Sequence, residues 1–158
     1  MFSIIIPTLN NLNYLKLCIN SIEKNSFYNH EIIVHANIAK DGTLDYLKKN
    51  KIKYTHTSYN SGIPEGVNMA ASKASTKYIV YGHDDFYFLP GWDTAFMKEI
   101  KSFPNNLYYL SGTMVQNGQV ALDCGDNLEN FNEQKLLNEH NNINYYDFQG
   151  STWAPHLI

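Results

Sequence analysis

The segment Tyr78-Ile-Val-Tyr-Gly-His-Asp-Asp85 decides how the rest of the sequence is interpreted. Its first four residues are β-branched or aromatic, which is typical of a buried strand, and Gly82 ends the run. His83, Asp84 and Asp85 follow at once. Adjacent carboxylates at the end of a buried strand repel each other, and oxygen ligands of this kind suit Mg²⁺ or Mn²⁺. The segment therefore predicts either a metal site or a solvated Asp-Asp turn, and the remaining sequence must decide between them.

Upstream of this segment, apolar runs typical of strands alternate with stretches of helical periodicity. Strands are predicted at 2–6, 31–34, 52–57 and 78–81, and helices around 12–22, 44–47 and 64–74. Pro7 is expected to stop the first strand and Pro64 to open the third helix. The alternation predicts an α/β fold with a mostly parallel central sheet, right-handed crossovers and helices on both faces.

The second half of the sequence is less regular. Trp92, Phe96 and Ile100 share one helical face and are expected in the core. Further strands are predicted at 107–112 and 145–148, a hairpin turn at Asn117-Gly118, a weak helix around residues 136–137 and a loop at 149–155.

Composition excludes several functional classes. The net charge of −3 and the lack of a basic run argue against a nucleic-acid or membrane-surface partner. No stretch approaches ~18 apolar residues, so no transmembrane segment is predicted. The start of the chain lacks the features of a signal peptide, and the two cysteines are expected to be reduced thiols in a cytoplasmic protein.

The basic residues are all lysines, 12 in number, and the sequence contains no arginine. A bound phosphate could therefore not be held by a bidentate guanidinium, and a metal, lysine or backbone N–H groups would have to meet its charge. In parallel sheets, ligands bind beyond the carboxyl ends of the strands where the strand order reverses. The loops that reach that edge are 7–11, 35–41, 60–66 and 83–85.

Short motifs on these loops carry a resemblance to a known family. They are Ser3-Ile-Ile-Ile-Pro-Thr8, Glu31-Ile-Ile-Val34 with Asp41-Gly-Thr43, Asn60-x-Gly62 with Asn68, His83-Asp-Asp85 and Leu89-Pro-Gly-Trp-Asp93. In this order they resemble family 2 of the inverting glycosyltransferases. The resemblance implies a Rossmann-like GT-A fold and one domain over residues 1–158. Residues 1–93 would form its nucleotide-sugar-binding half, and 94–158 a partial acceptor-side half.

The resemblance also implies roles for single residues. Asp85 would bind the metal, with His83 at the position of a second ligand, and Asp84 would face the sugar or its ribose. Asp84 and Asp85 are thereby the expected catalytic residues. The residues expected to bind the nucleotide-sugar are Pro7, Thr8, Asn10, Asn37, Asp41, Asn60, Gly62, Asn68 and Asp84.

The sequence departs from the family pattern around the base and the diphosphate. Ala36 stands where the family often has an acid that accepts a hydrogen bond from the base, so Asn37 or Asp41 would have to accept it. Discrimination between bases is therefore expected to be modest, with UDP favoured. Val67 stands where an arginine is common, which leaves Lys40 and Lys73 as helpers of the metal.

The acceptor side departs further. The family often carries its catalytic base in a Glu-Asp dipeptide, and none occurs after Asp85. The chain is therefore expected to be short or truncated inside the acceptor half. The carboxylates left as candidates for the base are Asp123, Asp126, Glu129 and Asp147.

The resemblance implies transfer of a sugar, with inversion, from a nucleotide diphosphate-sugar to a glycan or another hydroxyl acceptor. Mn²⁺ or Mg²⁺ would assist, and the context would be polysaccharide biosynthesis. One alternative is a module that binds nucleotide-sugar or carbohydrate without transfer. The other is a sugar-phosphate nucleotidyltransferase, which typically has a Gly-rich loop with Arg or Lys after its first strand. The loop Pro7-Thr-Leu-Asn-Asn11 has neither feature.

Overall fold

The structure is a computed structural model that describes residues 1–105, 108–115, 122–143 and 156–158. The chain divides into two compact units, Met1–Leu110 with His156–Ile158, and Ser111–Pro155. The elements in chain order are β1 (Ser3–Leu9), α1 (Leu12–Asn25), β2 (Glu31–Asn37), α2 (Thr43–Lys49), β3 (Lys53–Thr57), α3 (Gly62–Ala71), β4 (Ile79–Tyr81), α4 (Trp92–Ser102), β5 (Leu110–Ser111), α5 (Glu133–Glu139), the 3₁₀ turn η1 (His140–Asn142) and β6 (His156–Leu157).

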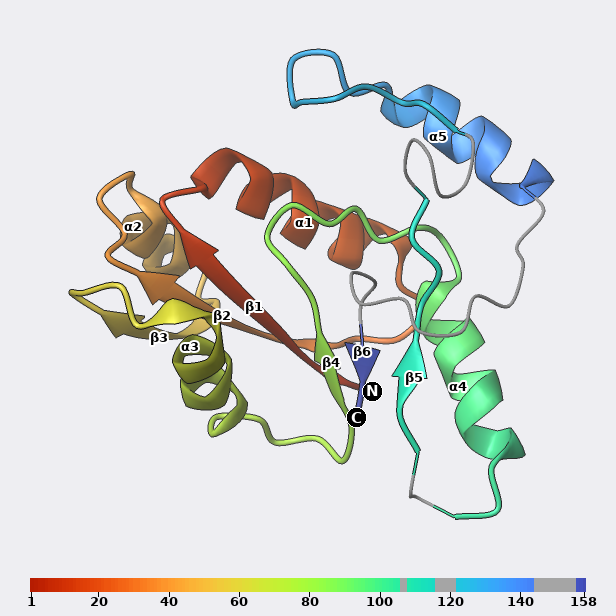
Figure 1. Cartoon of the computed structure of the whole chain (residues 1–158), viewed down its shortest axis with the longest axis horizontal. Helices are drawn as coiled ribbons and strands as arrows, with labels where there is room; N and C mark the ends of the chain where they lie inside the picture. The colour runs from red at the N-terminus through yellow and green to blue at the C-terminus, as the bar shows by residue number, and fades with distance from the viewer. Residues whose placement is uncertain (106–107, 116–121, 144–155) are drawn as a thin grey trace. The chain divides into compact units, whose positions relative to one another are not determined.

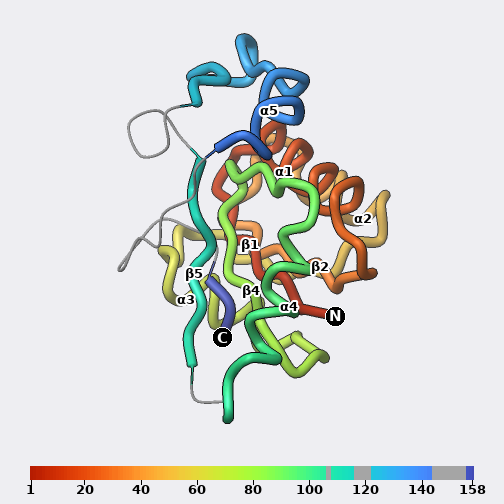
Figure 2. The backbone as a smooth tube through the Cα atoms, turned by 90° about the vertical axis from the view of Figure 1, so that its right-hand side faces the viewer, coloured from red at the N-terminus to blue at the C-terminus, as the bar shows by residue number. Residues whose placement is uncertain are grey.

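The strands form one sheet in the order β3-β2-β1-β4-β6-β5. The pairs β1–β2, β1–β4 and β2–β3 are parallel, and β6 runs antiparallel beside β4 (Figure 2). The chain winds outward from β1 through β2 to β3, and then returns to the other side of β1 with β4 (Figure 1). The order of the strands therefore reverses between β1 and β4, where ligands of such sheets bind.

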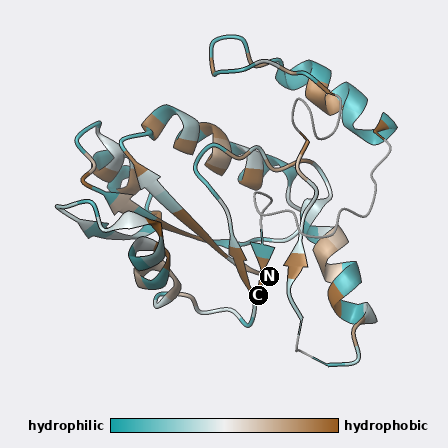
Figure 3. Cartoon of the chain, viewed as in Figure 1, coloured by the Kyte–Doolittle hydropathy of each residue, from teal (hydrophilic) through white to brown (hydrophobic). Residues whose placement is uncertain are grey.

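Apolar side chains cover both faces of the sheet, which confirms the predicted α/β architecture. Ile4 and Ile6 belong to a large buried cluster that includes Leu15 and Ile19 of α1 and Phe96 of α4. Successive side chains of a strand point to opposite faces, so the residue between the two isoleucines lies on the other side of the sheet. Figure 1 shows α1 and α3 on opposite faces, and Figure 3 shows the shaft of β1 in the hydrophobic colour.

The second face is covered by α3. Ile5 and Ile33 pack there against Ala70, with Val67 and Ala74 at the margin of the cluster. The alanines predicted on one face of this helix therefore face the sheet. The helix begins at Gly62 and ends at Ala71, so the predicted extension to residue 74 is wrong at its end.

β1 continues through Pro7 to Leu9, beyond the predicted end at residue 6. The carbonyl of Ile5 accepts a hydrogen bond from Gly82 N–H at 3.0 Å, so Ile5 turns its backbone polar groups toward β4. The backbone polar groups of Pro7 also face the β4 side of β1, but the pairing of β1 with β4 ends at Ile5. The missing N–H of proline therefore removes no ladder hydrogen bond. The prediction that Pro7 stops the strand is wrong.

β2 continues to Asn37, beyond the predicted end at residue 34. His35, Ala36 and Asn37 pair with residues 7–9 of β1 and 55–57 of β3. Their polarity indicated a loop, but two neighbouring strands supply backbone partners and extend the ladder. This extension brings the side chain of Asn37 to the edge of the sheet.

The remaining elements match the predictions less closely. The strand predicted at 107–112 is present only at Leu110–Ser111, and β6, which was not predicted, covers only His156–Leu157. The weak helix is α5, and it starts after Asn132, whose side chain accepts a hydrogen bond from Lys135 N–H at 2.9 Å. The predicted hairpin at 117–118, the strand at 145–148 and the loop at 149–155 lie outside the described residues. Among the residues that the structure describes, no helix has the length and apolar character needed to cross a membrane.

Candidate active site

Thr8 and Asp84 meet across the point where the strand order reverses. Thr8 ends the hydrophobic run of β1, and its hydroxyl donates to Asp84 Oδ2 at 2.6 Å. Asp84 lies on the loop after β4 and also accepts from the side chain of Asn11. Burial raises the pKa of Asp84 above its ordinary value, although both hydrogen bonds oppose the shift. Two residues 76 positions apart are thereby joined at the predicted edge.

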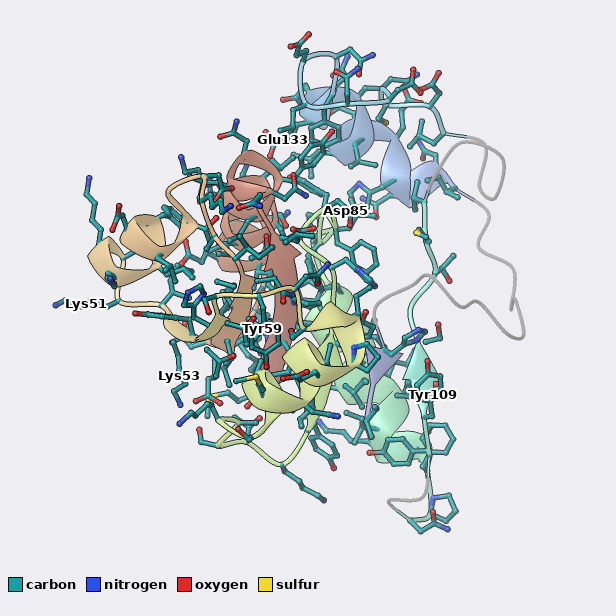
Figure 4. The ribbon with its side chains drawn as sticks, turned by 60° about the vertical axis from the view of Figure 1, so that its left-hand side comes forward. Lys51, Lys53, Tyr59, Asp85, Tyr109 and Glu133 are labelled. Atoms are coloured by element: carbon teal, nitrogen blue, oxygen red, sulfur yellow. The ribbon has the colours of Figure 1, made fainter. Side chains whose placement is uncertain are left out.

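His83 and Asp85 flank the partly buried carboxylate of Asp84. Asp85 is exposed, and Figure 4 shows it on the loop that follows β4. The ring of His83 packs against Tyr81 and Phe86, and its Nε2 lies 2.8 Å from the hydroxyl of Tyr81. This contact between His83 and Tyr81 was not predicted. Within the described part of the chain, no three His, Cys, Asp or Glu residues come together as a ready-made metal site.

Asn37 is buried at the carboxyl end of β2 and holds the loop that leads into α3. Its Oδ1 accepts from Ser61 N–H at 3.0 Å and from Ser61 Oγ at 2.7 Å, with Thr57 Oγ1 at 3.3 Å. Residues 57 and 61 are thereby fixed to β2. Figure 4 shows Tyr59, which lies between them, on the loop that leads into α3.

His35 extends this polar network, and the sequence did not predict its role. The side chain is fully buried on the α3 side of β2, with Nδ1 2.8 Å from Thr55 Oγ1 and Nε2 3.2 Å from Ser61 Oγ. Burial lowers the pKa of His35 and favours the neutral ring. Space for the ring depends on Gly66, since a Cβ there would lie 2.5 Å from His35 Cδ2.

Asp41 is committed to local structure. Its Oδ2 accepts from Leu12 N–H at 2.8 Å, and its Oδ1 accepts from the Thr43 N–H at 3.2 Å and the Thr43 hydroxyl at 2.7 Å. The carboxylate thus serves the first turns of both α1 and α2, neither of which has its own side-chain cap. Burial works to raise the pKa of Asp41, but these hydrogen bonds outweigh it and the pKa is lowered.

Three other predicted residues also support the backbone of these loops. Asn10 Oδ1 accepts from Lys40 N–H at 2.7 Å, and Asn60 Oδ1 accepts from Gly62 N–H at 3.0 Å. Gly62 has φ +72°, a conformation that favours glycine. Asn68 lies farther along α3 with its side chain exposed.

Lys73 does not lie at this edge. Its carbonyl accepts from Lys53 Nζ, which also pairs with Glu31 at the amino end of β2. The expected role of Lys73 beside a diphosphate is therefore wrong. Lys40, by contrast, is exposed next to Asn10.

The motif that ends in Asp93 is structural. Asp93 is fully buried, and its Oδ2 accepts from the N–H groups of Phe27 and Tyr28 at 2.8 and 2.9 Å. His30 Nε2 lies 3.0 Å from the same oxygen, while His30 Nδ1 accepts from Phe2 N–H at 3.1 Å. The neutral ring must therefore carry its hydrogen on Nε2 and donate it to Asp93. Burial lowers the pKa of His30 in spite of this carboxylate.

The candidates for the catalytic base lie in the second unit. Asp123 Oδ1 accepts from Gly125 N–H at 3.0 Å, and the carboxylates of Asp126 and Glu129 are exposed. Asp147 lies outside the described residues. Their assignment stays a prediction.

Comparison with known proteins now adds to this geometry. A model of the family described as glycosyl transferase family 2 matches residues 3–150. The chain belongs to this family. A comparison with curated protein sequences gives no match.

Solved structures of several other proteins resemble this family 2 chain. Residues 1–349 of TarS from S. aureus are 28% identical with a TM-score of 0.55, over 62% of this chain and 32% of that one. The complex of TarS with UDP-GlcNAc is 26% identical to this chain with a TM-score of 0.58, over 63% of this chain and 31% of that one. A third structure is glucosyl-3-phosphoglycerate synthase from Mycobacterium tuberculosis in complex with Mn²⁺, UDP and glucosyl-3-phosphoglycerate. It is 16% identical to this chain with a TM-score of 0.53, over 66% of this chain and 40% of that one. The predicted Rossmann-like GT-A fold is confirmed, and the chain aligns with about a third of TarS residues 1–349.

Proposed function

We propose that this family 2 chain binds a nucleotide-sugar at the carboxyl edge between β1 and β4, and transfers the sugar with inversion to a hydroxyl acceptor. The contact between Thr8 and Asp84 across the strand reversal carries the proposal. It fixes a carboxylate where ligands of parallel sheets bind, and Asp85 follows it with an exposed carboxylate. The TarS structures with UDP and UDP-GlcNAc support a uridine nucleotide as the first ligand to test.

The residues at this edge fit a divalent cation that is shared with the nucleotide. Mg²⁺ and Mn²⁺ prefer oxygen ligands, and Mg²⁺ sites usually combine one or two carboxylates with substrate phosphates and water. The carboxylate of Asp85 is exposed to solvent. Asp84 accepts from Thr8 through Oδ2, so its other carboxylate oxygen, Oδ1, does not take part in that hydrogen bond. A cation there would offset the negative charge that develops on the leaving diphosphate. Mn²⁺ accompanies the nucleotide in a mannosyltransferase from Pyrobaculum calidifontis and in the mycobacterial synthase.

The residues around this edge have separate roles in the proposed site. Thr8 and Asn11 orient the carboxylate of Asp84 by donating to it. Asp85 would hold the cation through its exposed carboxylate, and the cation would supply the positive charge that the diphosphate needs. His83 is held against the hydroxyl of Tyr81, so it serves the metal only by giving up that contact at Nε2 or by using Nδ1. A carboxylate outside this set would deprotonate the acceptor hydroxyl.

Binding of UDP tests the proposal. Isothermal titration with and without Mn²⁺ should show metal-dependent binding by the unaltered chain. Asp85→Asn should raise Kd at least tenfold in the presence of Mn²⁺, because removing a charged partner of a cation costs about 1.4 kcal/mol or more. Asp45→Asn, which removes an exposed carboxylate on α2, is the matched control and should leave Kd unchanged.

Equal affinity of Asp85→Asn and the unaltered chain for UDP and Mn²⁺ would contradict the site. Release of UDP from UDP-sugars, measured with and without hydroxyl acceptors, then separates transfer from binding alone. Binding without any release would favour the non-catalytic module.

A further inference from the structure

The amide of Asn37 has a fixed orientation. Ser61 presents its backbone N–H at 3.0 Å, and a backbone N–H can only donate, so the facing atom of Asn37 must be the oxygen. The Ser61 hydroxyl donates to the same oxygen at 2.7 Å. A rotated amide would place its NH₂ group against the backbone N–H and lose that hydrogen bond. The nitrogen Nδ2 therefore always points away from Ser61.

The neighbouring groups keep this arrangement rigid. Because the Ser61 hydroxyl gives its hydrogen to Asn37, it is free to accept from His35, whose Nε2 lies 3.2 Å away. The neutral His35 ring then accepts at Nδ1 from Thr55 Oγ1 at 2.8 Å, which completes its hydrogen bonding. The backbone of Asn37 is held as well, since it pairs with Leu9 in β1 and Thr57 in β3.

Among the described residues, Nδ2 itself has no hydrogen-bond partner. Asn37 is only 4% exposed, and across residues 1–105, 108–115, 122–143 and 156–158 nothing hydrogen-bonds this nitrogen. It is also not one of the fully buried polar atoms without a partner, so solvent reaches it. A buried, immobile amide thus offers two N–H donors at the edge of the sheet.

This donor lies where a nucleoside would extend from the diphosphate. β2 neighbours β1, and strands are about 4.8 Å apart, so the end of β2 is roughly 10 Å along the edge from β4. Of the side chains expected to accept from a base, none has an acceptor atom that is not already hydrogen-bonded. Ala36 has none, both oxygens of Asp41 are bound to α1 and α2, and the oxygen of Asn37 is bound to Ser61.

We propose that Asn37 reads the nucleobase as a donor, through a hydrogen bond from Nδ2 to the carbonyl oxygen O4 of uracil or O6 of guanine. Uracil O4 and guanine O6 accept at this position, whereas the amino groups of cytosine and adenine donate. The site therefore prefers the keto bases to the amino bases. This inference rests on the proposed function, because it assumes that the nucleotide binds at this edge.

The test is the affinity of the chain for UDP, GDP, CDP and ADP, measured by isothermal titration with Mn²⁺ at pH 7.5. The four ligands carry the same diphosphate, so the ratio of their affinities isolates the base. UDP and GDP should bind roughly tenfold to a hundredfold more tightly than CDP and ADP, because a donor that faces an amino group is left unpaired. UDP and GDP should differ less from each other than from the amino bases.

Asn37→Asp is the informative variant because it keeps the shape of the side chain. One carboxylate oxygen still accepts from Ser61, and the other replaces Nδ2 with an acceptor. The preference should then shift toward CDP and ADP by at least tenfold in the ratio of affinities. Asn20→Asp adds the same charge at an exposed position of α1, outside the proposed site, and should leave the ratio unchanged.

The outcomes separate this inference from the proposed function. Failure of all four diphosphates to bind would overturn both. If CDP or ADP bound as tightly as UDP and GDP, the proposed recognition of the base by Asn37 would be wrong. The proposed nucleotide site would not be contradicted by that result. The ranking in the unaltered chain decides this on its own if Asn37→Asp does not fold, which its thermal unfolding reveals.

Discussion

The carboxylate of Glu31, at the amino end of β2, accepts hydrogen bonds from four donors. They are Ser3 Oγ at 2.5 Å, Lys53 Nζ, and the N–H and hydroxyl of Ser75 at 2.9 and 3.0 Å. Burial works to raise the pKa of Glu31, but the hydrogen bonds from Lys53, Ser3 and Ser75 outweigh it and lower the pKa from 4.5 to about 2. The charged carboxylate is thus favoured in the folded chain.

This shift has a consequence for stability. A difference of about 2.5 pKa units corresponds to roughly 3 kcal/mol at most. Solvent reduces it, because the side chains of Glu31 and Lys53 are 17% and 45% exposed. We expect Glu31→Gln to lower the free energy of unfolding by about 2 kcal/mol at pH 7. The contribution is fully present above pH 4.5 and is lost as the pH falls through about 2.

Urea unfolding followed by circular dichroism at pH 7, 5, 4 and 3 measures this difference. The gap between the unaltered chain and Glu31→Gln should be constant from pH 7 to pH 5 and should narrow toward pH 3. Lys53→Gln is the control, and we expect it to cost less than about 1 kcal/mol because its ammonium is half exposed. A gap as large at pH 3 as at pH 7 would refute the linkage to the Glu31 carboxylate.

Two further predictions concern positions that support the site. Gly66→Ala should destabilise the chain by about 1–3 kcal/mol in thermal unfolding, because its Cβ would lie 2.5 Å from the buried ring of His35. Combining it with His35→Ala should recover part of that loss, and no recovery would contradict the steric explanation. Asp41→Asn should cost about 1 kcal/mol in urea unfolding by weakening the first turns of α1 and α2. It should leave the ratio of UDP to CDP affinity unchanged, and a changed ratio would mean that Asp41 reads the base.

The order of strands and helices could be predicted because the first 100 residues carry strong periodicity. Runs such as residues 3–6 have no helical pattern, and the apolar face of α1 recurs at helical spacing. The ends of strands could not be predicted in the same way. By residue type, Pro7 and His35 indicated the ends of strands. In the sheet, Pro7 pairs with β2 beyond the end of the β1–β4 ladder, and His35 pairs with both β1 and β3. β6 was missed because a strand of two residues has no period to detect.

The location of the site could also be predicted, but the use of its residues could not. Alternation and the position of Asp84 and Asp85 after β4 pointed to the carboxyl edge, and Thr8 does meet Asp84 there. Asp41 and Asn37 looked like free polar groups in the sequence. Which atoms of a polar side chain are already bound depends on residues far away in the chain, such as Ser61 for Asn37.

The polar edge of this sheet therefore contains two kinds of group. Most of its side-chain oxygens already accept hydrogen bonds. Asp41 accepts from the first turns of two helices, Asn37 Oδ1 accepts from Ser61, and Asp84 Oδ2 accepts from Thr8. Such groups give the edge its shape, and replacing them should cost stability before it costs selectivity. The carboxylate of Asp85 and the Nδ2 group of Asn37 remain for a ligand. The carboxylate can bind a cation, and the amide nitrogen can donate to a carbonyl oxygen. A nucleoside diphosphate bound through a divalent metal provides both the cation and the carbonyl oxygen.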